Sequence, residues 1–284
     1  MIIDGRTIAN SILENLSQRI RKLQKNYGIE PHLVVIRVGE DPAITSYIAQ
    51  KEKMAKKIGA IVSVYNFPSN VTEDELKACL DFLQTKTNIH GTILQLPLPP
   101  HLDGKKLLLE IRAEKDVDGF RPNSQFPVPI AQAVIKCLKI PYVKVAEKTE
   151  QIFDEWLKSK TVIVIGKGKT GGQPVIDALQ KKGIHPMIID TRTEHPEVIL
   201  KQADIIISAV GKEHVITKNI LKKDVILIGI GIHMTDEGKF AGDYNETEIK
   251  DIASWYTPVP GGVGPVNVAC LMENLVIATE NAVT

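Results

Sequence analysis

The sequence predicts an α/β fold of two domains, in which parallel sheets are covered by helices. Short apolar runs alternate with amphipathic segments of helical length along most of the chain, and this alternation is typical of parallel β-α-β units. The chain has 284 residues, more than one average domain. A stretch rich in proline and polar residues, 119–130, separates two alternating runs and predicts a linker.

The N-terminal run contains three predicted strands, at 33–38, 61–65 and 92–96. Helices are expected between them, at about 42–58 and 73–86. Asp41-Pro42 marks the beginning of the first helix and Gly59 its end. Thr72 and Glu75 have the spacing of a capping box at the start of the second helix.

The C-terminal run contains four predicted strands, at 162–165, 187–190, 205–208 and 225–228. A helix with Trp156 on its apolar face is expected within 142–159. A last helix begins near residue 265, and we expect it to return to the first domain, because an apolar helix is stable only in a core. The predicted domains are therefore 1–125 with 265–284, and 126–264.

The charges of the chain balance almost completely, with 35 basic and 34 acidic residues and a net charge of +1. This balance argues against a nucleic-acid or membrane partner held by electrostatics. The three cysteines show no CxxC pattern, which predicts buried thiols in a reducing compartment and neither disulfides nor a metal site: Cys79, Cys137 and Cys270. No signal peptide is apparent and no apolar run reaches the roughly 20 residues of a membrane span, so the expected location is cytoplasmic.

The segment from Pro260 to Pro265 holds three glycines and two prolines in six residues. Proline fixes φ, and glycine permits positive φ and a close approach of the backbone. Such a loop, leading into an apolar helix, suits a flat ligand lying against main chain. A plain turn with proline in the first helical turn fits the spacing equally well.

A second glycine-rich turn follows the predicted strand 162–165 and has the pattern GxGxxG before a helix. Glycines there allow a tight turn whose backbone amides reach a pyrophosphate. The alternative is a glycine-rich turn that binds nothing. Asp190 ends the next strand, where an acidic residue bonds the ribose of NAD. Arg192, Lys167 and Lys169 would favour the 2′-phosphate of NADP, so the residues alone leave both dinucleotides open.

Lys51 fills a gap in the apolar stripe of the predicted helix 42–58, and Tyr47 lies one turn earlier on the same side. A lysine that faces inward loses hydration, and its pKa falls towards values suited to proton transfer. The alternative is a lysine that covers apolar surface with its stem and keeps its ammonium in water.

Further polar residues lie at the ends of predicted strands. Gln95 interrupts the run 92–97, and Asp116 and Asp118 flank Val117 just before Gly119. Ligands of parallel sheets gather at the carboxyl ends of strands, where Gln95 falls. A satisfied strand-end glutamine and an aspartate turn cap explain these residues equally well.

Five stretches together resemble the methylenetetrahydrofolate dehydrogenase/methenyltetrahydrofolate cyclohydrolase family of the bacterial FolD type. They keep the order of the family over nearly the whole chain: Val38–Ala43 with Ser46, Tyr47 and Lys51; Gly91–Pro99 with His101; Lys115–Phe120; Gly166–Pro174; and Pro258–Asn274. The resemblance implies an N-terminal folate-binding domain completed by the last helix, a Rossmann-like domain that binds NADP, a cleft between the two, and a homodimer.

The resemblance also implies the reaction. 5,10-Methylenetetrahydrofolate would be oxidised with NAD(P) to 5,10-methenyltetrahydrofolate, which water opens to 10-formyltetrahydrofolate, in one-carbon metabolism and purine biosynthesis. Lys51 would assist proton transfer and activate water, and Tyr47 would stack on the folate. Gln95 would tune Lys51, and Asp118 would accept hydrogen bonds from the amino-pyrimidine edge of the pterin.

By the same resemblance, the expected substrate contacts are Tyr47, Gln95, Leu96, Asp118, Pro260, Gly261 and Gly262. The expected cofactor contacts are Gly166, Lys167, Gly168, Thr170, Gly171, Gly172, Asp190, Arg192, Ala209, Val210, Gly211 and Ile232.

The chain departs from the family's pattern mainly on the cofactor side. Lys167-Gly168 stands where the family has Arg-Ser, and Asp190 where a non-acidic residue is expected, so NAD is an alternative to NADP. Pro127–Ile130 replaces a Cys-Thr-Pro sequence, and 142–158 resembles an insertion. The alternatives are a member with only one of the two activities, a non-catalytic folate- or dinucleotide-binding protein, and a Rossmann oxidoreductase for another substrate.

Overall fold

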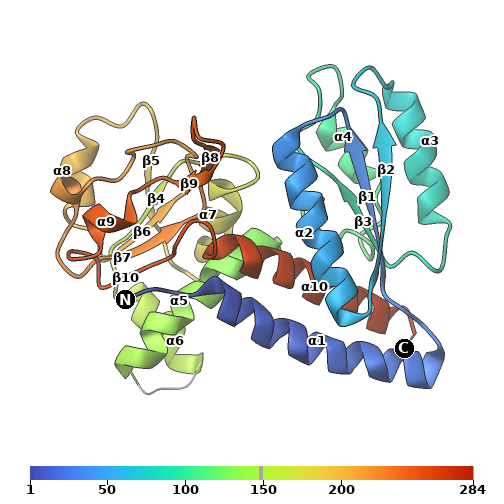
Figure 1. The fold of residues 1–284 in the computed structure, drawn as a ribbon, viewed down its shortest axis with the longest axis horizontal. Coiled ribbons are helices and arrows are strands. Elements are labelled where there is room, and N and C mark those ends of the chain that lie inside the picture. Colours follow the sequence, from blue (N-terminus) through green and yellow to red (C-terminus); the bar gives the residue numbers. More distant parts are fainter. Residues whose placement is uncertain (147–149, 284) are drawn as a thin grey trace. The chain divides into compact units, whose positions relative to one another are not determined.

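The computed structural model describes residues 1–146 and 150–283 (Figure 1). The chain divides into two compact units. The first unit comprises 9–129 and 268–284, and the second comprises 1–8 and 130–267. Two of the three divisions fall inside the long helices α1 (Gly5–Tyr27) and α10 (Val263–Asn281), and the third falls at the start of α5 (Pro129–Ala146).

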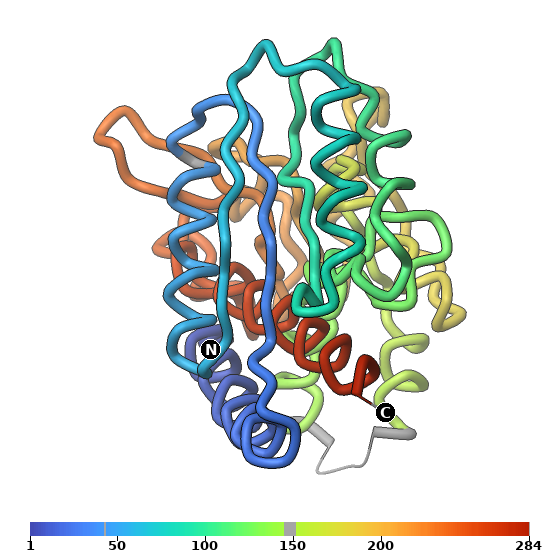
Figure 2. The backbone as a smooth tube through the Cα atoms, turned by 90° about the vertical axis from the view of Figure 1, so that its right-hand side faces the viewer, coloured from blue at the N-terminus to red at the C-terminus, as the bar shows by residue number. Residues whose placement is uncertain are grey.

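The first unit is built on a three-stranded parallel sheet in the order β2-β1-β3, whose strands run side by side in both views (Figures 1 and 2). All three predicted strands are present: β1 (His32–Val38), β2 (Ile61–Phe67) and β3 (Gly91–Leu94). β3 ends before Gln95 and Leu96, which were predicted to belong to it. Pro97 follows, and proline has no N–H with which to extend a ladder.

Helices cover both faces of this sheet. Leu33 and Val35 of β1 face a core shared with α1, α2 (Pro42–Ile58) and α10. Val34 and Ile36 face the opposite core, formed with α3 (Glu73–Gln84) and α4 (Gly104–Leu109). This alternation follows from the two-residue period of a strand. The predicted helix 42–58 and the capping box of Thr72 and Glu75 are confirmed.

The second unit holds a five-stranded parallel sheet in the order β10-β7-β6-β4-β5. Four strands match the prediction within a residue: β4 (Val162–Ile165), β5 (Met187–Ile189), β6 (Ile205–Ser208) and β7 (Ile226–Gly229). β10 (Trp255–Tyr256) was not predicted, and Ile3 and Met1 hydrogen-bond to its Tyr256. β8 (Ile232–Met234) and β9 (Phe240–Gly242) form an antiparallel hairpin, drawn in orange in Figure 2.

The helices of the second unit differ from the prediction in one region. The expected helix within 142–159 is the end of α5 (Pro129–Ala146) followed by α6 (Glu150–Lys158), while 147–149 lie outside the described residues. The predicted linker is shorter than 119–130, because Pro129 already begins α5, where proline is tolerated at a helix start. Trp156 is half-buried and lies 5.8 Å from Phe153 and 5.5 Å from Tyr142 between ring centres.

The remaining helices are short or flank the sheet. α7 (Gly172–Lys181) packs against β4. Residues of α8 (Pro196–Leu200) and α9 (Glu246–Ile249) join the core on one face of the sheet. Among the described helices, none is both long and apolar enough to cross a membrane.

Candidate active site

α2 places Lys51 in the gap of its apolar stripe. Ile48, Ala55 and Ile58 are buried on this helix, and Lys51 itself is only 2% exposed. Its Nζ donates a hydrogen bond to Gln95 Oε1 at 2.8 Å and lies 5.0 Å from the centre of the Tyr47 ring. The reading in which this lysine keeps its ammonium in water is therefore wrong.

Gln95 is held in place by its own backbone and side-chain bonds. Its N–H donates to Ile36 O at 2.9 Å, which keeps the backbone of Gln95 bonded to β1 directly after β3 ends. Its Nε2 donates to Leu96 O at 3.0 Å, which turns Oε1 towards Lys51. The side-chain amide thus presents an acceptor to the lysine.

The charges of Lys51 and Asp118 are coupled. Burial lowers the pKa of Lys51, because the ammonium loses hydration, and the negative charge of Asp118 opposes this shift. Burial likewise raises the pKa of Asp118, and the positive charge of Lys51 opposes it. Burial favours the neutral form of each group, so this lysine accepts a proton at lower pH than an exposed lysine would.

The turn that carries Asp118 is fixed by Asp116 and Gly119. Asp116 is 1% exposed; its Oδ2 accepts from the Arg121 N–H at 2.9 Å and its backbone oxygen from the Gly119 N–H at 3.1 Å. Gly119 has φ +72°, and a Cβ there would lie 2.8 Å from Phe126 O. The interpretation as a turn cap therefore describes Asp116, whereas Asp118 is half-buried beside the lysine.

Asn274 of α10 also secures this turn. Its side chain is 1% exposed, and its Nδ2 donates both to Val117 O at 2.8 Å and to Pro127 O at 2.9 Å. Asn274 ends one of the stretches that resemble the family, but no role was predicted for it. A buried amide in an apolar helix is the signal that marks it.

The loop 260–262 lies in the second unit, and the structure explains its glycines without a ligand. Gly261 has φ +115°, which side chains rarely adopt. A Cβ at Gly262 would lie 2.6 Å from Pro258 O, and one at Gly5 would lie 1.7 Å from Gly262 O. Packing of the chain on itself thus requires glycine at these positions. That Pro260–Gly262 contact the folate stays a prediction, as does the contact expected of Leu96, which is half-buried.

The GxGxxG turn packs tightly on one side and is open on the other. Gly166 has φ +85°, and its Cβ would lie 2.7 Å from Ala209 O; a Cβ at Gly172 would lie 1.9 Å from Gly166 O. At Gly168 a Cβ would meet no atom within 4 Å. Gly166, the first glycine of the pattern, and Gly172, which begins α7 directly after the pattern, are needed by the fold, while Gly168 leaves the backbone accessible, as a phosphate-binding turn requires.

The other predicted cofactor residues gather around this turn. A Cβ at Gly171 would touch Ala209 Cβ at 3.6 Å, and one at Gly211 would lie 2.9 Å from Ile232 O. Val210 lies between Ala209 and Gly211, and Thr170 is exposed in the turn itself. β4 and β6 are neighbours in the sheet, so these segments follow the carboxyl ends of adjacent strands.

Asp190 is engaged by both cations near it. Its carboxylate lies 2.7 Å from Lys167 Nζ and 3.2 Å from an Arg192 guanidinium nitrogen, and it accepts from the Arg192 N–H at 2.9 Å. The hydrogen bond from Lys167, with those from Arg192, holds the pKa of Asp190 well below its usual range. The acidic residue and the two cations therefore form one cluster.

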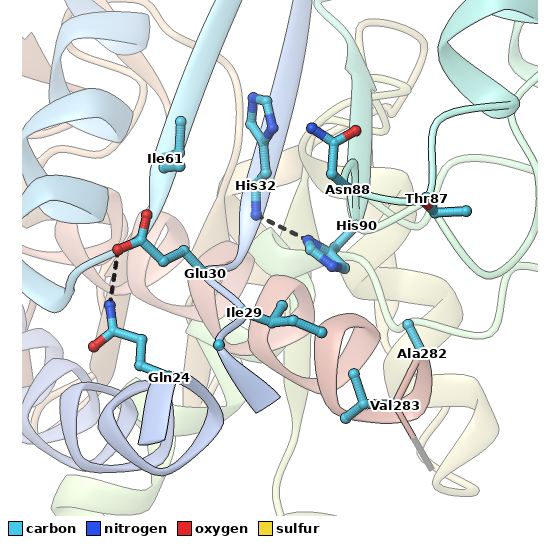
Figure 3. Close-up of a pocket in the computed structure, with 11 residues that line it drawn as sticks. Gln24, Ile29, Glu30, His32, Ile61, Thr87, Asn88, His90, Ala282 and Val283 are labelled. Atoms are coloured by element: carbon cyan, nitrogen blue, oxygen red, sulfur yellow. Dashed lines mark hydrogen bonds between the residues drawn. The ribbon is translucent and has the colours of Figure 1, made fainter. Parts of the chain in front are cut away.

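A pocket lies at the amino ends of the strands of the first unit, at the other end of the sheet from Gln95 (Figure 3). It has a volume of about 790 Å³, and His32, Ile61 and His90 mark its position at the amino ends of β1, β2 and β3. No predicted site residue lines it. Within 1–146 and 150–283, no group of three or more His, Cys, Asp or Glu side chains is arranged to hold a metal ion.

Two family models match the chain. Residues 3–118 match the tetrahydrofolate dehydrogenase/cyclohydrolase catalytic domain, and residues 146–283 match the NAD(P)-binding domain of the same family. The chain is 36% identical over 280 residues to "Bifunctional protein FolD" of Enterococcus faecalis, covering 98% of each chain.

Solved structures give the same result. The bifunctional methylenetetrahydrofolate dehydrogenase/cyclohydrolase FolD of Campylobacter jejuni superposes with a TM-score of 0.89 at 32% identity, covering 99% of both chains. The enzyme of Trypanosoma brucei, solved with NADP and an inhibitor, also gives a TM-score of 0.89, at 27% identity over 100% of this chain and 98% of the other. The chain therefore belongs to the tetrahydrofolate dehydrogenase/cyclohydrolase family of bifunctional, NAD(P)-dependent enzymes.

Proposed function

We propose that Lys51 transfers the protons of the reaction, with Tyr47, Gln95 and Asp118 completing the catalytic set. The observation that carries this proposal is the burial of Lys51, at 2% exposure, with its Nζ bonded to Gln95 at 2.8 Å. The family membership supplies the reaction, in which methylenetetrahydrofolate is oxidised and the methenyl product is hydrolysed.

The hydrolytic step needs a base. Water adds to the methenyl carbon, and neutral Lys51 accepts one of its protons. The remaining hydroxyl proton moves to N5 of the folate as the carbon–N5 bond breaks and the formyl carbonyl forms. The methenyl group loses its positive charge in this step. One proton is therefore released for each molecule hydrolysed, and it leaves through Lys51.

The other residues bind and orient the substrate. Tyr47 offers a ring for stacking, and the centre of this ring lies 5.0 Å from Lys51 Nζ. Asp118 accepts hydrogen bonds from the amino-pyrimidine edge of the pterin. We assign the folate to 1–125 with 265–284, with Leu96 and the loop Pro260–Gly262 as further contacts, and the dinucleotide to 126–264.

We propose that NADP is the preferred dinucleotide. When it is bound, NADP supplies the group that accepts the hydride. The relative from Trypanosoma brucei was solved with NADP. The cluster of Lys167, Arg192 and Asp190 holds two cations and one carboxylate, and the surplus positive charge suits a 2′-phosphate. The residues that would hold the pyrophosphate are the open turn around Gly168 and Thr170.

A spectrophotometric assay tests the dehydrogenase claim and the lysine separately. Formation of the methenyl product is followed with NADP and with NAD, and its hydrolysis is followed alone. Lys51→Ala should lose at least about a hundredfold in hydrolysis, the range expected for a general base. Lys53→Ala, on the exposed side of the same helix, serves as control and should match the wild type. Wild-type protein that turns over neither dinucleotide would refute the dehydrogenase role.

Asp190→Ser tests the dinucleotide choice. Removal of the carboxylate frees Lys167 and Arg192, so the affinity for NADP should rise while that for NAD falls or stays unchanged. Fluorescence titration of both dinucleotides measures the ratio. An unchanged ratio would show that Asp190 does not discriminate between them.

We also propose that the protein is a cytoplasmic homodimer. Its three cysteines form no disulfide, which suits a reducing compartment. Met234 of β8 is 49% exposed, and an exposed apolar side chain on a strand favours association. Sedimentation equilibrium tests the dimer, and a mass near 31.4 kDa at all concentrations would exclude it.

A further inference from the structure

A carboxylate with no assigned role lies beneath the loop that follows β6. Asp243, directly after β9, is fully buried. Its Oδ2 accepts from Ser208 Oγ at 2.5 Å and from the Val210 N–H at 3.1 Å. Its Oδ1 accepts from the N–H groups of Gly211 at 2.7 Å and Lys212 at 3.0 Å. Four donors therefore converge on one side chain.

Three of these donors are successive backbone amides. Such a run forms a concave anion-binding nest, and here the anion is supplied by the protein itself. Gly211 reaches this conformation with φ +73°. A Cβ at Gly231 would lie 2.4 Å from both oxygens of Asp243, so the chain closes over the carboxylate from another side as well. The charge and the loop are thus locked together.

The loop held in this way lies at the dinucleotide turn. Ala209 lies next to both Gly166 and Gly171. In the sheet, β4 has β6 on one side and β5, the next strand in sequence, on the other. This is the point where the strand order reverses, and ligands of open parallel sheets bind at such a point. The conformation of 209–212 therefore shapes one wall of that place.

We propose that Asp243 is a positioning residue that sets dinucleotide affinity by fixing residues 209–212, without touching the dinucleotide. This inference rests on the proposed binding of the dinucleotide at the Gly166 turn. A carboxylate accepts from all four donors, whereas an amide in its place offers one acceptor oxygen and a competing NH₂ group. At least two donors then lose their partner and the loop relaxes.

The test compares Asp243→Asn with the wild type by direct titration of NADP and NAD, which requires no turnover. Since bonds to a charged group are lost, we expect the dissociation constant to rise about tenfold or more. Hydrolysis of the methenyl substrate should stay near the wild-type rate, because Tyr47, Lys51, Gln95 and Asp118 all belong to the first unit. Ser208→Ala, which removes only one donor, should give a smaller change in the same direction.

Tyr244→Phe is the matched control. It removes a buried hydrogen bond, from Tyr244 Oη to Thr257 O at 2.6 Å, in the residue next to Asp243 but away from the loop. It should lower the thermal unfolding midpoint without changing dinucleotide affinity. Wild-type affinity in folded Asp243→Asn would overturn the proposal, as would equal losses of affinity in Tyr244→Phe. Failure of the wild type to bind either dinucleotide would instead overturn the proposed cofactor site.

Discussion

A single lysine shows how far residue patterns predict this site. Lys51 is recognisable because it occupies a core position in an otherwise apolar stripe, and the structure buries it. Its bond to Gln95 joins residues 44 positions apart and depends on how α2 lies against β3. Asp243 gave no signal of its own, because its four donors are mostly backbone amides that no sequence pattern displays.

The pH dependence of hydrolysis should report on Lys51. Burial lowers its pKa, so the neutral form that accepts a proton is populated at lower pH than for an exposed lysine. The rate should therefore rise with pH through that lowered pKa and then level off. Asp118→Asn removes the charge that opposes the shift, so any remaining activity should level off at lower pH. A profile independent of pH would contradict Lys51 as the base.

Asp116 should make the protein less stable as the pH rises. Burial raises its pKa from 3.8 to about 6, so the folded state holds a proton that the unfolded chain releases. Its contribution to stability is complete below about pH 3.8 and is lost as the pH rises through about 6. Asp116→Asn cannot ionise and should gain roughly 2–3 kcal/mol relative to the wild type between about pH 4 and pH 7.

Urea unfolding of both proteins across this range measures the difference. His90, whose buried ring has its pKa lowered to about 4, has the opposite dependence, but it is present in both proteins and cancels. A difference that does not change with pH would show that Asp116 titrates normally.

At the scale of elements, the sequence predicts buried strands best. β4 is a continuous apolar run, and β6 is apolar up to its last residue, Ser208; both lie within the predicted ranges, because a strand buried on both faces is mostly apolar. α1 was not predicted, although Ala9, Leu13, Leu16, Ile20 and Leu23 mark a buried helical stripe that could have revealed it. β10 has two residues, too few to show any period, and it is defined only by its partner β7.

The N-terminus of α3 should depend on its capping box. Thr72 Oγ1 accepts from the Glu75 N–H at 3.3 Å, and the Glu75 carboxylate accepts from the Thr72 N–H at 2.9 Å. Thr72→Ala should lower the free energy of unfolding by about 1 kcal/mol, the usual cost of losing a cap. Asp81→Ala, at an exposed position of the same helix, should not lower it. Equal denaturation midpoints for Thr72→Ala and the wild type would show that the cap is dispensable.

At the scale of the whole molecule, each compact unit combines segments from distant parts of the chain. Residues 1–8 belong with 130–267, and 268–284 belong with 9–129. The sequence shows no sign that residues 1–8 belong with 130–267. Met1–Ile3 is too short to show a pattern, and it pairs with β10 through backbone hydrogen bonds. The alternating runs, in contrast, were enough to predict two α/β units.

Dinucleotide binding should stabilise the protein independently of the lysine chemistry. A ligand at a hundred times its dissociation constant adds about 2.7 kcal/mol to the stability of the state that binds it. NADP should therefore raise the thermal unfolding midpoint of the wild type and of Lys51→Ala equally. Scanning fluorimetry measures both, and a shift lost in Lys51→Ala would place the dinucleotide against the lysine.

The cluster of Lys167, Asp190 and Arg192 has a consequence for how binding responds to the medium. Two cations and one carboxylate leave one uncompensated positive charge at an exposed turn, where dissolved salt screens charges over about 10 Å at 0.1 M. The dissociation constant for NADP should therefore increase with ionic strength more steeply than that for NAD, and most steeply in Asp190→Ser. Parallel salt titrations measure these slopes, and equal slopes would place the 2′-phosphate elsewhere. Discrimination between the two dinucleotides would then be a property of the solution as well as of the protein, strongest in dilute buffer and weakest at high salt.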